Sequence, residues 1–220
     1  MSDSLPDLTL LETRILGTLL EKQRTVPDTY PLSVNALQSG CNQKTSRNPV
    51  IEASEAEILV ALDVLKEHGL VREVSGGRVS RFEHLLEKGL GVPAQASALL
   101  AVLMLRGPQT AGELRLNCER LHRFADISSV EAFLAELAER TDGSLVVLLP
   151  RLPGARESRW MHLLSGKANV ETLQPGAASV VGPGADIDDL RTRIAALEAE
   201  VAALRELVLE RTGQQGAAER

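Results

Sequence analysis

Arginine is the residue type in this sequence with the clearest chemical potential, because five copies fall in two short segments that contain glycine or proline. They are Arg78, Arg81, Arg151, Arg156 and Arg159. A guanidinium group binds phosphate oxygens through parallel hydrogen bonds, so arginines on a protruding hairpin commonly hold a nucleic-acid backbone or a minor groove. The alternative is surface ion pairing, for instance with Glu83 or Glu157. The sequence leaves both interpretations open.

A second basic candidate is the polar segment 42–49, which contains Lys44 and Arg47. Its side chains and backbone N–H groups could hold an anion. The interpretation that we favour is a loop whose Asn, Ser and Thr side chains bond their own backbone. A comparable place further along the chain holds Arg115, Arg120 and Arg123.

Residue types suited to catalysis or metal binding occur without the spacing that such sites need. Cys41 and Cys118 are isolated, and no glycine-rich phosphate loop or nucleophile motif is present. His84 and His162 recur at matching places, which predicts packed, hydrogen-bonded side chains and not a ligand pair. We therefore expect a non-enzymatic protein with no metal and no cofactor.

Capping boxes indicate the helices that position these residues. A Ser or Thr followed three residues later by Glu occurs at Thr9, Ser54, Thr110 and Ser128. In such a box the hydroxyl and the carboxylate each accept a backbone N–H from the first turn. Apolar stripes follow three of the boxes and predict helices after Thr9, Ser54 and Ser128. Two further helices are expected at about residues 32–40 and 95–106.

Two hairpins complete a repeated order of helix, helix, helix and hairpin. The predicted hairpins cover residues 70–86 and 145–164. Residues 75–86 align without a gap on residues 153–164, with Phe82 opposite Trp160 as equivalent core anchors. The predicted fold class is mainly α with small β-hairpins. The predicted organisation is two tandem winged helix-turn-helix domains, at residues 1–90 and 91–164.

Several sequence strings carry a family resemblance: LEKQ (20–23), YPLS (30–33), CNQKT (41–45), LRGPQT (105–110), GELR (112–115) and ESR (157–159). Together they resemble the bacterial YceH-like proteins over nearly the whole chain. The resemblance implies a tandem winged-helix fold. It implies no activity, because that family is functionally uncharacterised. Asn117 stands where the family often has Arg, which weakens any basic role of that helix.

Charge argues against base reading by the third helix of each repeat. The chain carries a net charge of −6, and residues 54–68 hold four carboxylates against Lys66. Residues 128–140 hold three glutamates against Arg140. Carboxylates are repelled by phosphate, so neither helix is expected in a major groove. Aromatic residues make up only 2% of the chain, which argues against a surface for stacking single-stranded bases.

The C-terminal segment predicts a coiled coil behind a flexible linker. Residues 165–185 are rich in Gly and Pro, and residues 186–212 carry a heptad pattern with β-branched residues at each a position. Its apolar residues are Ile187, Leu190, Ile194, Leu197, Val201, Leu204 and Val208. The alternative is a helix docked on the body of the protein. Flanking charges favour a parallel homodimer, because Arg193 would face Glu198 of a partner and Glu200 would face Arg205.

The leading functional hypothesis is a dimeric, nucleic-acid-associated protein of a regulatory kind, which contacts the phosphate backbone of double-stranded DNA through its wings. Its candidate contacts are Lys44, Arg47, Arg78, Arg81, Arg151, Arg156 and Arg159. The alternative is an adaptor whose acidic helices face a basic protein partner. No signal peptide and no apolar run of bilayer length is present, so we expect a cytoplasmic protein without a membrane partner.

Overall fold

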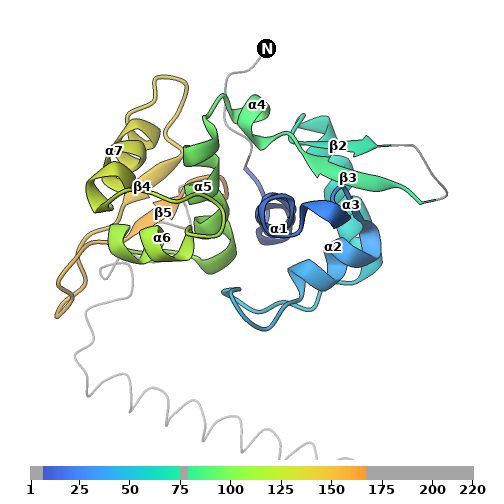
Figure 1. The fold of residues 1–220 in the computed structure, drawn as a ribbon, viewed down its shortest axis with the longest axis horizontal. Helices are drawn as coiled ribbons and strands as arrows, with labels where there is room; N and C mark the ends of the chain where they lie inside the picture. Colours follow the sequence, from blue (N-terminus) through green and yellow to red (C-terminus); the bar gives the residue numbers. More distant parts are fainter. Residues whose placement is uncertain (1–6, 75–78, 167–220) are drawn as a thin grey trace, which may run out of the picture. The chain divides into compact units, whose positions relative to one another are not determined.

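The computed structural model describes residues 7–74 and 79–166, which form short helices and two small antiparallel sheets (Figure 1). The first half contains α1 (Leu10–Thr25), η1 (Pro27–Thr29), β1 (Leu32–Ser33), α2 (Val34–Cys41), α3 (Glu55–Glu67), β2 (Val71–Val74) and β3 (Arg81–His84). The second half contains α4 (Leu86–Leu90), α5 (Ala94–Arg106), α6 (Ala111–Asn117), α7 (Ile127–Ala138), β4 (Val146–Leu148) and β5 (Trp160–His162). The predicted class, mainly α with small β-hairpins, is confirmed, and the order of elements is consistent with a winged-helix topology.

Three of the four predicted capping boxes are confirmed. Thr9, Ser54 and Thr110 each cap a helix, and the glutamate three residues later binds back to the cap backbone. The box at Ser128 is wrong. The cap of α7 lies two residues earlier, because the Asp126 carboxylate accepts the Ser129 backbone N–H at 2.7 Å and its hydroxyl at 2.6 Å. A carboxylate at this position also interacts favourably with the helix dipole.

Three other boundaries differ from the sequence prediction. Leu32 and Ser33 do not begin a helix but form strand β1, and the Ser33 hydroxyl then caps α2. The second strand of the first hairpin stops at His84, and the short helix α4 follows it where the sequence predicts a continuing strand. Helix α5 begins at Ala94, one residue before the predicted start.

The two hairpins sit in equivalent surroundings. The first sheet has the order β1-β3-β2 and pairs Leu32 with Phe82. In the second half, Gln109 forms a bridge with Trp160 beside the pair β4-β5. Phe82 is buried, and Trp160 is half-buried against the core. This correspondence supports the sequence alignment of the two hairpins.

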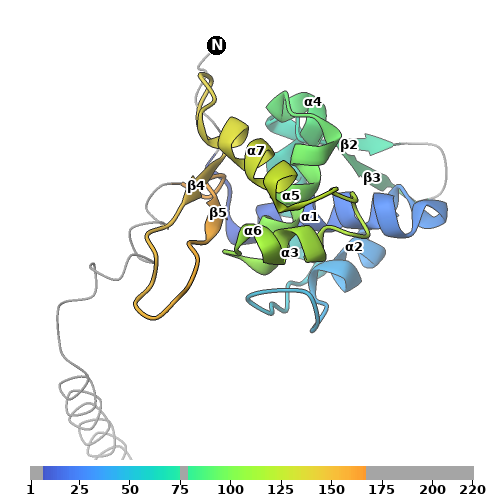
Figure 2. The same ribbon diagram turned by 60° about the vertical axis from the view of Figure 1, so that its left-hand side comes forward.

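The two halves share one core. Helices α1 and α5 pack against each other, and Figures 1 and 2 show that they cross. Every residue of α5 from Ala96 to Leu105 is buried. A methyl group built at Gly17 of α1 would lie 2.8 Å from Leu105 Cγ and 3.2 Å from the Ala101 carbonyl oxygen. Glycine therefore allows the two helices to approach closely. One apolar cluster joins buried side chains of both halves.

Some predictions fall on residues outside the described ranges. Arg78 lies in the gap at 75–78. The heptad residues of the predicted helix 186–212 lie beyond residue 166. The predicted linker 165–185 also lies beyond it, except for its first two residues. The division into domains at 1–90 and 91–164 stays a prediction. In the described part of the chain, no helix has both the length and the apolar character needed to cross a membrane.

Candidate interaction surfaces

The outer face of α3 combines exposed apolar side chains with carboxylates. Ala56, Val60 and Val64 follow one another at every fourth position and so form one stripe along the helix. The Val60 side chain is 66% exposed, and Leu59 beside it is 42% exposed. Exposed carboxylates border this stripe, and they belong to Glu55, Glu57, Asp63 and Glu67. We call the stripe, the four bordering acidic residues and Leu59 together the α3 face. All of its residues are exposed or half-exposed.

The opposite side of helix α3 packs into the core, so the α3 face points toward solvent. Ile58, Leu62 and Leu65 are fully or almost fully buried in the core. The one basic residue of the helix, Lys66, is already engaged in ion pairs. Its ammonium lies 2.7 Å from the Asp63 carboxylate and 3.6 Å from that of Glu73. Hydrogen bonds from Ser54 lower the pKa of Glu57, so that carboxylate stays ionised at neutral pH.

The equivalent helix α7 provides an internal comparison. The caps Ser54 and Asp126 align, and the buried positions Ile58, Leu62 and Leu65 then fall on Val130, Leu134 and Leu137. In this register Leu59, Val60 and Val64 correspond to Glu131, Ala132 and Glu136. The fold itself therefore does not require large apolar side chains on this outer face. The acidic residues of α3 are predicted from the sequence, whereas Leu59 and Val60 are not; alignment of the two helices identifies them.

The wing arginines at equivalent positions bind the protein's own backbone. Arg81 donates to the Pro31 carbonyl at 2.8 Å, and Arg159 donates to the Pro108 carbonyl at 2.9 Å. Arg159 also forms an ion pair with Glu113 at 3.0 Å, where the sequence suggested Glu157. These contacts hold each hairpin against the segment before α2 or α6.

The remaining hairpin candidates differ in exposure and in the contacts around them. Arg151 and Arg156 are exposed at the second hairpin. Glu83, the suggested partner of a wing arginine, pairs with Arg72 of the neighbouring strand β2. Among the hairpin arginines that the structure describes, Arg151 and Arg156 thus remain the candidates for contact with an external group.

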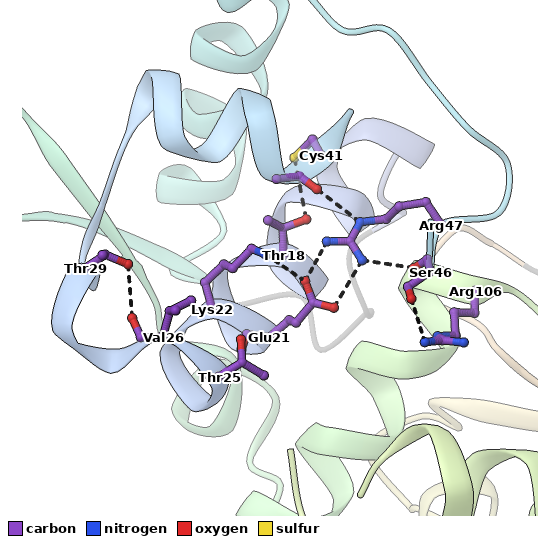
Figure 3. A network of polar contacts seen from close by, with 11 residues as sticks. Thr18, Glu21, Lys22, Thr25, Val26, Thr29, Cys41, Ser46, Arg47 and Arg106 are labelled. Carbon is purple, nitrogen blue, oxygen red and sulfur yellow. Dashed lines mark hydrogen bonds and ion pairs between the residues drawn. The ribbon is translucent and has the colours of Figure 1, made fainter. Parts of the chain in front are cut away.

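Arg47 lies inside the protein, which corrects its assignment as a nucleic-acid contact (Figure 3). Its guanidinium binds the Glu21 carboxylate at 2.6 Å and 3.1 Å, and its Nε donates to the Gly40 carbonyl at 3.1 Å. A side chain buried in these contacts cannot reach a phosphate. Lys44, three residues earlier, is exposed and keeps its place as a candidate.

The segment 42–49 has a structural role, but its hydrogen bonds run to other parts of the chain, whereas the favoured interpretation expected its Asn, Ser and Thr side chains to bond the loop's own backbone. The Asn42 amide donates to the Ala53 carbonyl at 2.9 Å and accepts the Ala53 backbone N–H at 2.9 Å. The segment is also fastened to the second half of the chain. The Asn48 N–H donates to the Leu105 carbonyl at 2.8 Å, and Arg106 donates to the Ser46 hydroxyl at 2.8 Å (Figure 3).

His84 and His162 lie in equivalent, buried positions of the two halves, and so do Cys41 and Cys118. His84 Nε2 lies 2.9 Å from the Gln23 side-chain oxygen, and burial lowers the pKa of His84. Burial lowers the pKa of His162 to about 4. Burial also raises the pKa of Cys41 to about 11 and that of Cys118 to about 12, so both remain thiols. Among residues 7–74 and 79–166, no group of three potential metal ligands is present.

Comparison with known proteins places this arrangement in a bacterial family. Residues 8–155 match the family described as "Protein of unknown function, DUF480". The chain is 75% identical over 212 residues to a UPF0502 protein of Dechloromonas aromatica, covering 96% of this chain and 99% of that protein. It is 56% identical over 215 residues to a UPF0502 protein of an Acidovorax species, covering 96% of each chain. A UPF0502 protein of Burkholderia pseudomallei is 60% identical over 206 residues, covering 93% of this chain and 88% of that protein.

The matches to these relatives extend over nearly the full chain, and they agree with the resemblance to YceH-like proteins seen in the sequence strings. The chain belongs to the DUF480/UPF0502 family of uncharacterised bacterial proteins.

Proposed function

We propose that the protein is a non-enzymatic protein-binding module made of two duplicated winged-helix units. In this proposal the α3 face docks a partner whose apolar side chains are bordered by basic ones. The observation that carries it is the internal comparison: Val60 is exposed on α3, whereas the equivalent residue of α7 is Ala132. A large apolar side chain that the fold does not need, within a ring of carboxylates, suits a protein interface better than open solvent.

The duplication rests on correspondences between the two halves. The caps Thr9 and Pro93, Ser33 and Thr110, and Ser54 and Asp126 begin equivalent helices. Arg81 and Arg159 make the same contact to a proline carbonyl. Three helices followed by a hairpin, with the third helix facing outward, is the order of a winged helix-turn-helix unit. The assignment of a binding role to the third helix is by analogy with that fold.

Charge favours a basic partner over DNA at this face. The helix that would enter a major groove carries four carboxylates, and its Lys66 already contacts Asp63 and Glu73. Carboxylates near phosphate are repelled, whereas they attract lysine and arginine of a protein partner. Two of the wing arginines that the DNA hypothesis needs, Arg81 and Arg159, are bound to backbone carbonyls of the protein itself. Lys44, Arg151 and Arg156 remain the exposed DNA candidates, and DNA binding is an outcome of the test.

The test compares two probes and two matched variants of the full chain. The probes are a fluorescent amphipathic peptide of leucine and lysine and a fluorescent duplex DNA, measured by anisotropy. Val60→Arg places a cation on the α3 face, and Ala132→Arg places the same cation at the equivalent position of α7. We expect Val60→Arg to weaken peptide binding by about tenfold or more, a change of roughly 1.4 kcal/mol, and Ala132→Arg to leave it nearly unchanged.

Two outcomes would overturn the proposal. One is an equal loss of peptide affinity in both variants, which would mean that the peptide responds only to net charge. The other is tighter binding to the duplex than to the peptide, with a loss of that affinity when Lys44, Arg151 and Arg156 are replaced by Ala. A steep dependence of duplex affinity on salt concentration would accompany that second outcome.

A further inference from the structure

We propose that the α3 face of one copy binds the outer face of α6 on a second copy of the chain. The inference rests on the proposed function, because it names a partner for the same site. It starts from Leu116 of α6, whose side chain is 69% exposed and is the most exposed large apolar side chain among residues 7–74 and 79–166. Val60 of α3 comes next, at 66%.

Leu116 has surroundings of the opposite charge to those of Val60. Four arginines lie on α6, on the segment after it, or against it: Arg115, Arg120, Arg123 and Arg159. Arg120 and Arg123 are exposed, whereas Arg115 and Arg159 also donate to carbonyl groups of the protein itself. Three carboxylates lie among or beside them. Glu113 is paired with Arg159 at 3.0 Å, Asp126 interacts electrostatically with Arg115, and Glu119 is exposed. We call Leu116 with these arginines the α6 face, and its local charge is positive.

The internal repeat shows that Leu116 is not a requirement of the fold. The buried positions Leu37 and Cys41 of α2 align with Leu114 and Cys118 of α6. In this register Leu116 corresponds to Ser39, which is a polar residue at the same place on the first unit. Each half therefore carries exposed or half-exposed large apolar residues that the other half lacks at the equivalent positions: Leu59, Val60 and Val64 in the first and Leu116 in the second.

The α3 face and the α6 face are complementary in charge and in apolar character. The α3 face has an apolar stripe between carboxylates, and the α6 face has one leucine beside arginines. A leucine can pack between the side chains of a valine stripe when two helices cross, while carboxylates and guanidinium groups meet at the rim. The two faces of one molecule do not cover each other, because Val60 and Leu116 are both exposed in the same chain. A second copy can cover both.

The contact joins two different faces, and each copy carries one face of each kind. If each face meets a different copy, the assembly extends into a chain or closes into a ring, whereas a second copy that covers both faces gives a closed two-fold dimer. Two short helical faces bury little area, so we expect weak, concentration-dependent association.

The experiment uses the full-length protein in sedimentation velocity over a wide range of concentrations. Every protein in the comparison also carries Ile194→Asp and Leu197→Asp, which removes association through the predicted coiled coil at 186–212. With otherwise wild-type sequence, we expect the sedimentation coefficient to rise with concentration. Val60→Arg and Leu116→Asp should each stop this rise, because each variant loses one of the two faces. Ala132→Arg and Ser39→Asp make the same changes at the equivalent positions of the other half, and we expect both to behave as wild type.

Mixing provides the decisive measurement. Val60→Arg keeps an intact α6 face, and Leu116→Asp keeps an intact α3 face. A mixture of these two variants should therefore form one new contact per pair and produce a faster-sedimenting species that neither variant forms alone. Circular dichroism establishes that each variant is folded before the comparison is made.

The proposal is overturned if wild type and both variants sediment alike, if the mixture forms no new species, or if Ala132→Arg and Ser39→Asp are as damaging as the changes on the two faces. Peptide binding separates this failure from failure of the proposed function. Peptide binding can depend on Val60 even when the α3 face of one copy does not bind the α6 face of another. In that case the α3 face has a different partner. If the peptide also fails to bind, both proposals fall.

Discussion

Lys44 and Arg47 lie three residues apart in one loop, yet one side chain is exposed and the other is enclosed. The difference comes from tertiary structure. The Glu21 carboxylate, on helix α1, holds the Arg47 guanidinium at 2.6 Å, and the carbonyl of Gly40 accepts a further hydrogen bond. Removing one partner of a buried ion pair leaves the other charge poorly compensated, and such changes cost several kcal/mol.

We therefore predict that Arg47→Ala lowers the free energy of unfolding by on the order of 3 kcal/mol. Lys44→Ala, at an exposed position of the same loop, should change it by less than about 0.5 kcal/mol. Urea denaturation followed by circular dichroism gives both values. Equal stability of the two variants would contradict a structural role for Arg47.

A second residue-scale prediction concerns His162. Burial lowers its pKa to about 4 from the ordinary value of 6.5. Between these two pH values the unfolded chain binds more protons than the folded chain, so the free energy of unfolding falls as the pH is lowered. From pH 7 to pH 5 we expect a loss of about 2 kcal/mol from this residue, and little further loss below pH 4.

The measurement is urea denaturation at pH 7 and pH 5 for wild type and His162→Gln. The variant should lose less stability than wild type on acidification, whatever its stability at pH 7. His68→Gln replaces an exposed histidine and serves as the control, with a pH dependence like that of wild type. A wild-type pH dependence in His162→Gln would show that other groups cause the effect. His84 contributes in the same direction, because burial also lowers its pKa.

At the scale of elements, the contact between α1 and α5 predicts that a glycine-to-alanine substitution in a helix lowers the stability of the protein. Replacing glycine by alanine within a helix ordinarily stabilises the protein, by up to about 1 kcal/mol. At Gly17 the added methyl group would lie 2.8 Å from Leu105 Cγ, so the helices must separate. We expect Gly17→Ala to destabilise the fold by roughly 1–3 kcal/mol.

Gly112 of α6 supplies the matched control. A methyl group there would lie 3.8 Å from Ile127 Cδ1, which is an ordinary contact distance. Gly112→Ala should therefore leave the melting temperature unchanged or raise it, whereas Gly17→Ala should lower it. Stabilisation by both substitutions would mean that α1 and α5 are not closely packed.

Helix starts and hairpins were readable from the sequence where their signals are local. The boxes at Thr9, Ser54 and Thr110 act between residues three apart, and they are confirmed. Ser128 was misread because a competing cap, Asp126, lies two residues before it and binds the Ser129 N–H. Strand β1 was missed because its two residues depend on pairing with β3, which lies about fifty residues away.

For the candidate sites too, some features can be predicted from the sequence and others depend on tertiary structure. Acidic charge on α3 is visible in the sequence, but exposure of Val60 depends on which side of the helix the core covers. Arg81 and Arg159 were predicted on the hairpins, whereas their bonds to the Pro31 and Pro108 carbonyls arise only when segments about fifty residues apart meet. Residue type can be read from the sequence, but the availability of a side chain depends on its tertiary partners.

At the scale of the whole molecule, the predicted coiled coil at 186–212 adds a second mode of association. Its residues lie outside those that the structure describes, and the prediction rests on the heptad pattern. Replacing Ile194 and Leu197 by Asp should make the protein monomeric in light scattering at low concentration, with the helices at 10–162 still folded. The same oligomer after the change, or a monomeric wild type at high concentration, would refute it.

Burial of α5 on all sides has a consequence for how the protein opens. Its amides from Ala96 to Leu105 lie between both halves, so their exchange with solvent deuterium requires disruption of the shared centre. We expect these amides to exchange most slowly of all. The slowest amides of α1 and α7 should respond to added denaturant with the same slope as those of α5. Although its architecture repeats, the body of the protein would then open as a single cooperative unit.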